Sequence, residues 1–219
     1  ELQVFSVSDW QSNQEKILGE IERTFGLSNL IVRSSCHAED NFCSSNAGAF
    51  LSIPGVKRPN VGAAVDQVIA SYGQPKDCDE IIVQNMVEDV CFSGVIFSHD
   101  PNNGTPYRVI NWHDGVDTSF VTSGKGGRLL YCAATASIHK QGQFSGILKL
   151  LEELLELFDG VPLDCEFAVS GPPNNQKIWL LQVRPLLVSA KIQPENEQAV
   201  SLNELQSWLT HAMGKHPFL

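Results

Sequence analysis

The sequence is poor in positive charge and contains no long apolar run. Only 15 of its 219 residues are Lys or Arg, against 25 Asp or Glu, so the formal net charge at pH 7 is −10. General nucleic-acid binders cluster cations against the phosphate backbone, and this charge balance therefore excludes that class. No stretch of about 18 apolar residues occurs. We therefore expect no membrane-spanning helix and no membrane partner.

The cysteines lack the close pairing that structural zinc sites normally show. None of the six stands in a C-x-x-C pair: Cys36, Cys43, Cys78, Cys91, Cys132 and Cys165. The spacing therefore does not favour a zinc site. The residues after Glu1 show neither the basic region nor the apolar core of a secretory leader. We expect reduced thiols and a cytoplasmic location.

The remaining composition, 42% hydrophobic and 18% charged, is that of a folded globular chain. Apolar residues recur at helical spacing over residues 14–25, 61–72 and 147–158. A capping-box pattern at Ser201–Glu204 predicts a last short helix. Strand-like runs cover residues 30–32, 81–87, 92–98, 107–112, 129–133, 164–169 and 177–183. Because several of these strands follow one another without a helix between them, the order favours an α+β fold over a doubly wound parallel sheet.

The last two predicted strands carry the most informative polar pattern. Side chains alternate across a strand, so Asp164 and Glu166 share one face, and Gln182 and Arg184 share one face of the returning strand. If the strands pair, these four polar groups lie above an apolar underside that includes Leu181. Such oxygen ligands suit Mg²⁺ with shared phosphate oxygens, and an Arg neutralises phosphate. The spacing alone favours a simpler interpretation, a solvated hairpin face with a cross-strand ion pair.

Two loop segments are weaker candidates for an anion site. Arg33-Ser34-Ser35 lies where the first buried strand gives way to a loop, and the small residues of Ser44–Gly48 can offer backbone N–H groups to phosphate. Ser and Gly gather in any loop, so neither signal is specific. The Gly-rich residues 123–127 do not match a Walker A loop. His37, beside Cys36, has no partner at helical spacing, and a polar surface loop explains it better than a metal site.

Taken in order, several motifs carry a more specific signal than any one of them. They are Val32–Asp40, Ser45–Phe50, Val83–Val87, Ser93–Pro101, and Asp164–Phe167 followed by Leu181–Pro185. In this order they resemble the nucleotide-binding domain of the pyruvate phosphate dikinase, phosphoenolpyruvate synthase and rifampin phosphotransferase family. The resemblance covers about residues 30–186. It implies an ATP-grasp fold, in which two α+β lobes with mostly antiparallel sheets close over ATP and Mg²⁺, here with an incomplete N-terminal part.

The resemblance also implies roles for individual residues. Arg33 and Arg184 would act as catalytic groups against the ATP phosphates, and Glu166 and Gln182 would hold the metal. The implied nucleotide-binding residues are Arg33, Ser45, Gly48, Gln84, Met86, Val87, Asp164, Glu166, Gln182 and Arg184. Within this set, the strand from Gln84 to Val87 would meet the adenine.

In the family, this domain splits ATP and passes a phosphoryl group to a carrier histidine on a separate domain. The resemblance thus implies residues 1–75 as part of the first ATP-grasp lobe, 76–189 as the remaining lobe with the metal and phosphate hairpin, and 190–219 as a linker and C-terminal helix. The usual Gly-Leu-Gly-Glu sequence is missing from residues 111–124. The family's ATP-binding Gly-Gly-Lys segment is not found before Val32, and no carrier-histidine motif is recognisable, so a catalytically inactive nucleotide-binding or regulatory module remains an alternative. A partner-docking domain that uses the helix after Ser201 is a further alternative.

Overall fold

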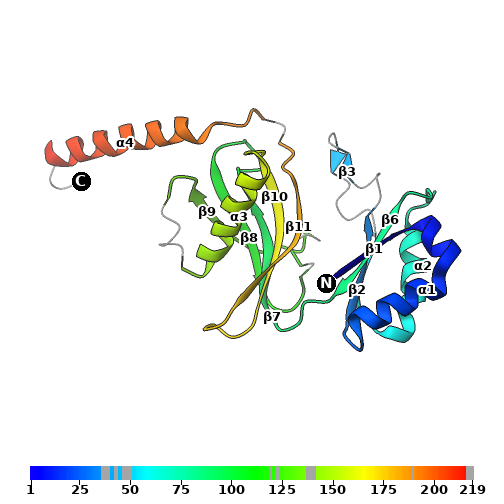
Figure 1. Cartoon of the computed structure of the whole chain (residues 1–219). Helices are drawn as coiled ribbons and strands as arrows, with labels where there is room; N and C mark the ends of the chain where they lie inside the picture. The colour runs from blue at the N-terminus through cyan, green and yellow to red at the C-terminus, as the bar shows by residue number, and fades with distance from the viewer. Residues whose placement is uncertain are drawn as a thin grey trace. The chain divides into compact units, whose positions relative to one another are not determined.

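The structure is a computed structural model that describes residues 1–35, 40–41, 44–45, 51–118, 120–121, 124–136, 142–188 and 190–215, with the backbone alone at 40, 41, 44, 45 and 215. The chain divides into two compact units, Glu1–Glu88 and Asp89–Leu219. Each unit contains an antiparallel sheet with helices packed on one face (Figure 1). The α+β class, with two lobes and mostly antiparallel sheets, is confirmed.

Unit 1 is built on a four-stranded sheet of order β1-β6-β2-β5. Its elements are β1 (Leu2–Ser6), α1 (Val7–Phe25), β2 (Leu30–Ser35), β3 (Asp40–Asn41), β4 (Ser44–Ser45), β5 (Ser52–Val56), the short 3₁₀ helix η1 (Arg58–Asn60), α2 (Val61–Ser71) and β6 (Glu80–Asn85). β3 pairs with β4. The apolar sides of α1 and α2 pack against one face of the sheet, where Val32, Val65 and Val83 are fully buried.

Helix α1 begins earlier than the predicted residue 14. The Ser6 hydroxyl accepts a hydrogen bond from the Asp9 backbone N–H, and the Asp9 carboxylate accepts one from the Ser6 N–H. This reciprocal capping satisfies donors that a helix start otherwise leaves unpaired. The turns that it starts bury Val7 and Trp10 in the core, and a kink at Asn13, whose backbone is non-helical, separates them from the predicted helix over residues 14–25.

The boundary between the units lies at Glu88 and Asp89, further along the chain than the expected boundary at residues 75 and 76. The reason is strand β6, which pairs with β1 on one side and with β2 on the other. A central strand cannot leave its sheet without breaking both ladders. Residues 80–85 therefore belong to the first unit.

Unit 2 is built on a five-stranded sheet of order β11-β10-β7-β8-β9. Its elements are β7 (Val90–Phe97), β8 (Tyr107–Asp114), β9 (Arg128–Ala133), the 3₁₀ helix η3 (Gly142–Phe144), α3 (Ser145–Leu157), β10 (Leu163–Ser170), β11 (Lys177–Pro185) and α4 (Glu195–Lys215). Helix α3 packs Ile147, Leu148 and Leu151 into a core with one face of this sheet. The other face is left for the candidate site.

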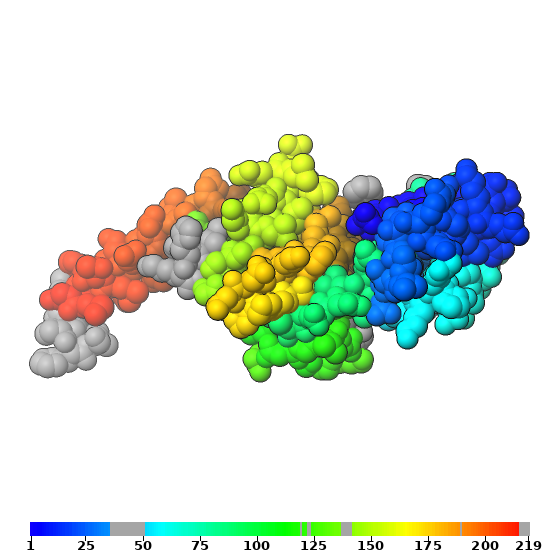
Figure 2. Space-filling model, turned by 60° about the horizontal axis from the view of Figure 1, so that its bottom comes forward, coloured from blue at the N-terminus to red at the C-terminus, as the bar shows by residue number. Residues whose placement is uncertain are grey.

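Helix α4 starts at Glu195, so the prediction that Ser201 caps a last short helix is wrong. Ser201 lies inside the helix, and contact clustering groups the helix with unit 2. In Figure 2 the helix, coloured orange to red, projects from the rest of that unit. Among the described residues, no helix has both the length and the apolar character needed to cross a membrane.

Candidate functional site

Strands β10 and β11 pair as the alternation pattern predicts. Asp164 lies opposite Arg184, and Glu166 lies opposite Gln182, in an antiparallel ladder. The intervening β10 residues Cys165 and Phe167 are buried in the core beneath α3. The four polar residues therefore share the sheet face opposite that helix.

A β-bulge interrupts this ladder directly beside the polar group. Glu166 pairs with Gln182, but the next β10 residue, Phe167, pairs with Leu180, so the register passes over Leu181. Leu181 was expected on the apolar underside, and Leu180 instead lies opposite the core residue Phe167. A bulge adds local twist and re-aims neighbouring side chains. The bulge does not disturb the two cross-strand pairs, Asp164 with Arg184 and Glu166 with Gln182, which we call the two polar rows.

Asp164 and Arg184 form a two-point ion pair. The Arg184 Nη2 and Nε atoms lie 2.7 Å and 2.8 Å from the Asp164 Oδ2 atom. Burial raises the pKa of the Asp164 carboxyl above its usual value, and the attraction of Arg184 offsets only part of that effect. A buried carboxylate with a raised pKa is common at functional sites, although structural ion pairs can show it too. The pair holds the Arg184 guanidinium in one orientation beside the next row.

Glu166 and Gln182 supply a carboxylate and an amide in that next row. Within the described part of the chain, no group of three His, Cys, Asp or Glu side chains could hold a metal ion. Mg²⁺ does not require such a cage, because it keeps several waters and takes one or two protein oxygens together with phosphate oxygens. The donor set therefore fits Mg²⁺ that is bound jointly with a polyphosphate.

The sheet continues both polar rows into side chains that the sequence did not single out, and these are apolar or aromatic except for Asn111. The first row runs Arg184, Asp164, Phe97, Val109 and Tyr131, and the second runs Gln182, Glu166, Val95, Asn111 and Leu129. Tyr131 and Leu129 are about half exposed, at 49% and 59%. The alternation of side chains within residues 93–97 could have identified Val95 and Phe97 as members of this face. The face thus combines a charged half with a mainly apolar half.

Asp117 and Phe120, in the segment that follows β8, lie against the same face. The rings of His113 and Phe120 stack with centroids 3.7 Å apart. The Ser93 hydroxyl donates to the Asp117 carbonyl oxygen over 3.4 Å, and Lys125 Nζ lies 3.5 Å from the Asp117 carboxylate. Asp117 and Phe120 belong to the segment that lacks Gly-Leu-Gly-Glu. They contact Ser93 and His113, which form the next cross-strand pair on the same face after Val95 and Asn111 of the Glu166 row.

Unit 1 carries two predicted site residues on one sheet face. Arg33 of β2 pairs with Ile82, and Gln84 of β6 pairs with Ile31. The residues between them, Val32 and Val83, point to the opposite, helix-covered core. Arg33 and Gln84 therefore lie on neighbouring strands of the face away from α1 and α2.

Met86 and Val87 were expected to continue the β6 strand, and this prediction is wrong. The strand ends at Asn85, and the Met86 N–H donates to the Asn29 carbonyl oxygen over 2.9 Å. Both residues lie in the segment that leads to the unit boundary. The predicted contacts of Ser45 and Gly48 lie outside the described residues, because only the backbone of Ser45 is described, as part of β4.

Comparisons with known proteins identify no family. No protein-family model matches the sequence, and no curated protein matches it. Among solved structures, the D-alanine-D-alanine ligase from Helicobacter pylori matches with 11% identity and a TM-score of 0.43, over 85% of this chain and 45% of that one. D-alanyl-alanine synthetase A from Vibrio cholerae matches with 12% identity and a TM-score of 0.43, over 85% of this chain and 50% of that one. The chain thus spans about half the length of these structures.

Proposed function

We propose that this chain is an ATP- and Mg²⁺-binding domain of the ATP-grasp type from a phosphotransferase. The observation that carries the proposal is the pair of cross-strand rows, Asp164 with Arg184 and Glu166 with Gln182, on the sheet face opposite α3. A planar guanidinium beside two oxygen donors is an arrangement suited to a triphosphate with its metal. The same residues occupy matching positions in the pyruvate phosphate dikinase-like motifs.

In this proposal each residue has a distinct task. Glu166 and Gln182 hold Mg²⁺ through their oxygens, and Arg184 neutralises phosphate charge. Asp164 fixes the orientation of Arg184 through their two contacts of 2.7 Å and 2.8 Å. In unit 1 we propose nucleotide contacts for Arg33, with catalytic weight, and a further set at Ser45, Gly48, Gln84, Met86 and Val87.

The proposed reaction transfers a phosphoryl group from ATP to a carrier histidine on another domain. Phosphoryl transfer needs little covalent chemistry from the protein, because catalysis consists mainly of positioning and charge neutralisation. Arg184 and Arg33 are suited to this task because guanidinium groups remain charged at any physiological pH. Bound Mg²⁺ would supply further neutralisation of the phosphate oxygens.

The first test measures Mg²⁺-ATP binding through thermal stability. A ligand that binds only the folded state stabilises it by RT ln(1 + [L]/Kd), about 2.7 kcal/mol at a hundredfold excess over Kd. We expect Mg²⁺-ATP to raise the unfolding temperature and ATP with EDTA to raise it much less. The absence of any shift with Mg²⁺-ATP would refute nucleotide binding.

The second test assigns the site by substitution. Glu166→Gln removes one charge without shortening the side chain, and we expect it to weaken Mg²⁺-ATP binding by roughly tenfold or more, the scale typical of metal-site substitutions. Glu153→Gln is the matched control, since Glu153 is 63% exposed on α3 and pairs only weakly with Lys149 at 3.8 Å. Equal affinity in the two variants would contradict the assignment.

A third measurement separates the proposal from a nucleotide-binding module without catalysis. Labelled ATP is incubated with the protein together with its carrier domain, and phosphohistidine is quantified. We expect label on histidine, with Arg184→Lys strongly reduced because an ammonium group cannot replace the planar fork. Normal Mg²⁺-ATP binding with no transfer of label would favour the non-catalytic module.

A further inference from the structure

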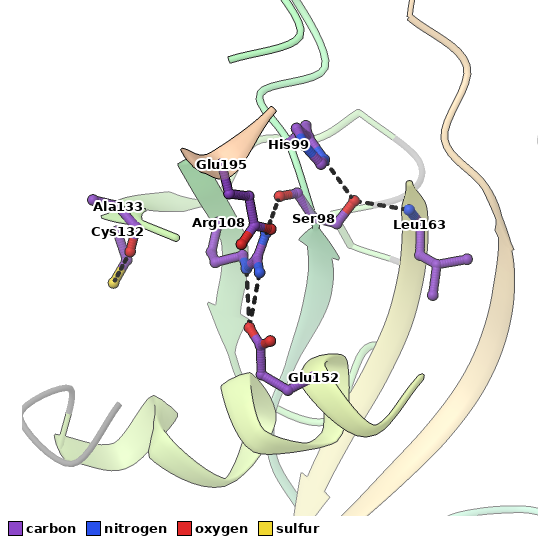
Figure 3. Close-up of polar contacts among 8 residues, drawn as sticks. All are labelled: Ser98, His99, Arg108, Cys132, Ala133, Glu152, Leu163 and Glu195. Carbon is purple, nitrogen blue, oxygen red and sulfur yellow. Dashed lines mark hydrogen bonds and ion pairs between the residues drawn. The ribbon is translucent and has the colours of Figure 1, made fainter. Parts of the chain in front are cut away.

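A buried arginine on the opposite, α3-covered face of unit 2 joins three elements that are distant in sequence. Arg108 of β8 is 2% exposed. Its side chain contacts Ser98 at the end of β7, Glu152 of α3 and Glu195 at the start of α4 (Figure 3). None of these residues belongs to the candidate nucleotide site.

Glu152 and Ser98 accept three of the five N–H groups of the Arg108 guanidinium without Glu195. Its Nε and Nη2 atoms donate to the Glu152 Oε1 atom over 3.2 Å and 2.9 Å, and its Nη1 atom donates to the Ser98 carbonyl oxygen over 2.7 Å. One carboxylate is enough to neutralise one guanidinium. Glu195 Oε1, at 2.8 Å from Nη1, is therefore a second carboxylate beyond what the buried charge requires.

The two carboxylates differ in the number of Arg108 nitrogens that they contact. Glu195 lies beside Nη1 alone and is 43% exposed, so it can return to water at little cost, whereas Glu152, which is 39% exposed, accepts from two Arg108 nitrogens and keeps the buried charge paired. Just before Glu195, the Gln193 N–H donates to the Gly104 carbonyl oxygen over 2.9 Å. The Lys191 backbone lies so close to Gly104 that an added Cβ there would come within 2.8 Å of the Lys191 oxygen. Residues 190–195 thus lie along the β7–β8 turn.

We propose that residues 190–195 form a releasable latch, closed by the ion pair between Glu195 and Arg108, that sets the direction in which α4 extends from the sheet of unit 2. Breaking the pair frees the segment and the helix while the sheet, α3 and the Arg108–Glu152 pair remain folded. Helix α4 is suited to such movement, because its larger apolar residues Leu205, Trp208 and Met213 are 52–64% exposed. The inference goes beyond the proposed nucleotide site and does not depend on it.

Tryptic cleavage after Lys191 is the test. Lys191 is exposed, but its backbone lies against Gly104 in the closed latch. Cleavage after Lys191 therefore reports the population of the open latch when opening and closing are fast relative to proteolysis. In Glu195→Ala we expect the rate of cleavage between Lys191 and Ile192 to rise roughly fivefold or more. Mass spectrometry of the fragments measures this rate. Faster hydrogen exchange at the Gln193 amide should accompany it.

Glu197→Ala is the matched control. Glu197 is exposed in the same first helical turn, and none of the ion pairs described for the chain involves it. The control removes the same charge near the helix start, so it separates the ion pair from the helix-dipole effect. Equal acceleration in both variants, or none in Glu195→Ala, would overturn the latch. A large fall in the unfolding temperature of Glu195→Ala would also overturn it, because the residue would then be part of the fold.

Discussion

At the scale of single residues, burial separates the thiols of this protein into two groups. Among the described cysteines, Cys78 and Cys91 are exposed and Cys132 and Cys165 are buried, all four without disulfides. Burial, with a smaller contribution from the nearby Asp164 charge, raises the pKa of the Cys165 thiol to about 12. Because the thiolate is the reactive form, Cys165 is an inert core residue although it lies between two proposed site residues.

This difference predicts which thiols can be alkylated. In native protein treated with iodoacetamide at pH 8, we expect Cys78 and Cys91 to be modified and Cys165 to stay unmodified, with the difference abolished in urea. Peptide mass spectrometry measures the extent of modification at each cysteine. Modification of Cys165 at the rate of Cys91 in folded protein would show that the β10 core face is open to solvent.

At the scale of elements, glycine has a different role in each of the two units. Gly94 lies in β7 opposite Trp112, and a Cβ there would overlap the Asn111 backbone and lie 2.8 Å from the Trp112 Cα atom. The missing side chain therefore allows the central strands β7 and β8 to approach each other. Gly19 lies within helix α1 and has no atom within 4 Å of an added Cβ. At that position glycine only weakens the helix.

We therefore expect opposite effects from two identical substitutions. Gly94→Ala should lower the free energy of unfolding by about 2 kcal/mol or more, because backbone must shift to admit the methyl group. Gly19→Ala should raise it by roughly 0.5–1 kcal/mol through helix propensity. Urea unfolding followed by circular dichroism measures both. A neutral Gly94→Ala would mean that the β7–β8 pair is looser than described.

At the scale of the whole molecule, the two units have separate hydrophobic cores. One cluster of buried residues joins α1 and α2 to the sheet of unit 1, and the other joins α3 to the sheet of unit 2. The strand residues Ile81 and Ile110 are both 0% exposed and belong to different clusters. Stability should therefore be distributed by unit, since each core is an independent cooperative group.

A matched pair of cavity substitutions tests this distribution. Ile81→Ala and Ile110→Ala should each cost about 2–5 kcal/mol of stability. We expect hydrogen exchange to accelerate in residues 1–88 alone for the first variant and in residues 89–188 alone for the second. Acceleration in both parts of the chain by either variant would indicate one cooperative unit.

Local pattern was sufficient to predict much of this fold. The apolar stripe predicted α2 to within a residue, and alternation correctly assigned Asp164 and Glu166 to one face and Cys165 and Phe167 to the other. These features depend only on the 3.6-residue and two-residue periods of the backbone. The sequence alone therefore determined which residues face each sheet's core and which polar groups share the β10–β11 surface.

Only the tertiary structure determined which residues far apart along the chain contact each other. The bulge that passes over Leu181, the inclusion of β6 in unit 1, and the meeting of Arg108 with Glu152 and Glu195 each depend on how distant segments pair. Side-chain period says which face a residue occupies but not which strand or helix will lie against it, because that choice is made by packing over the whole core.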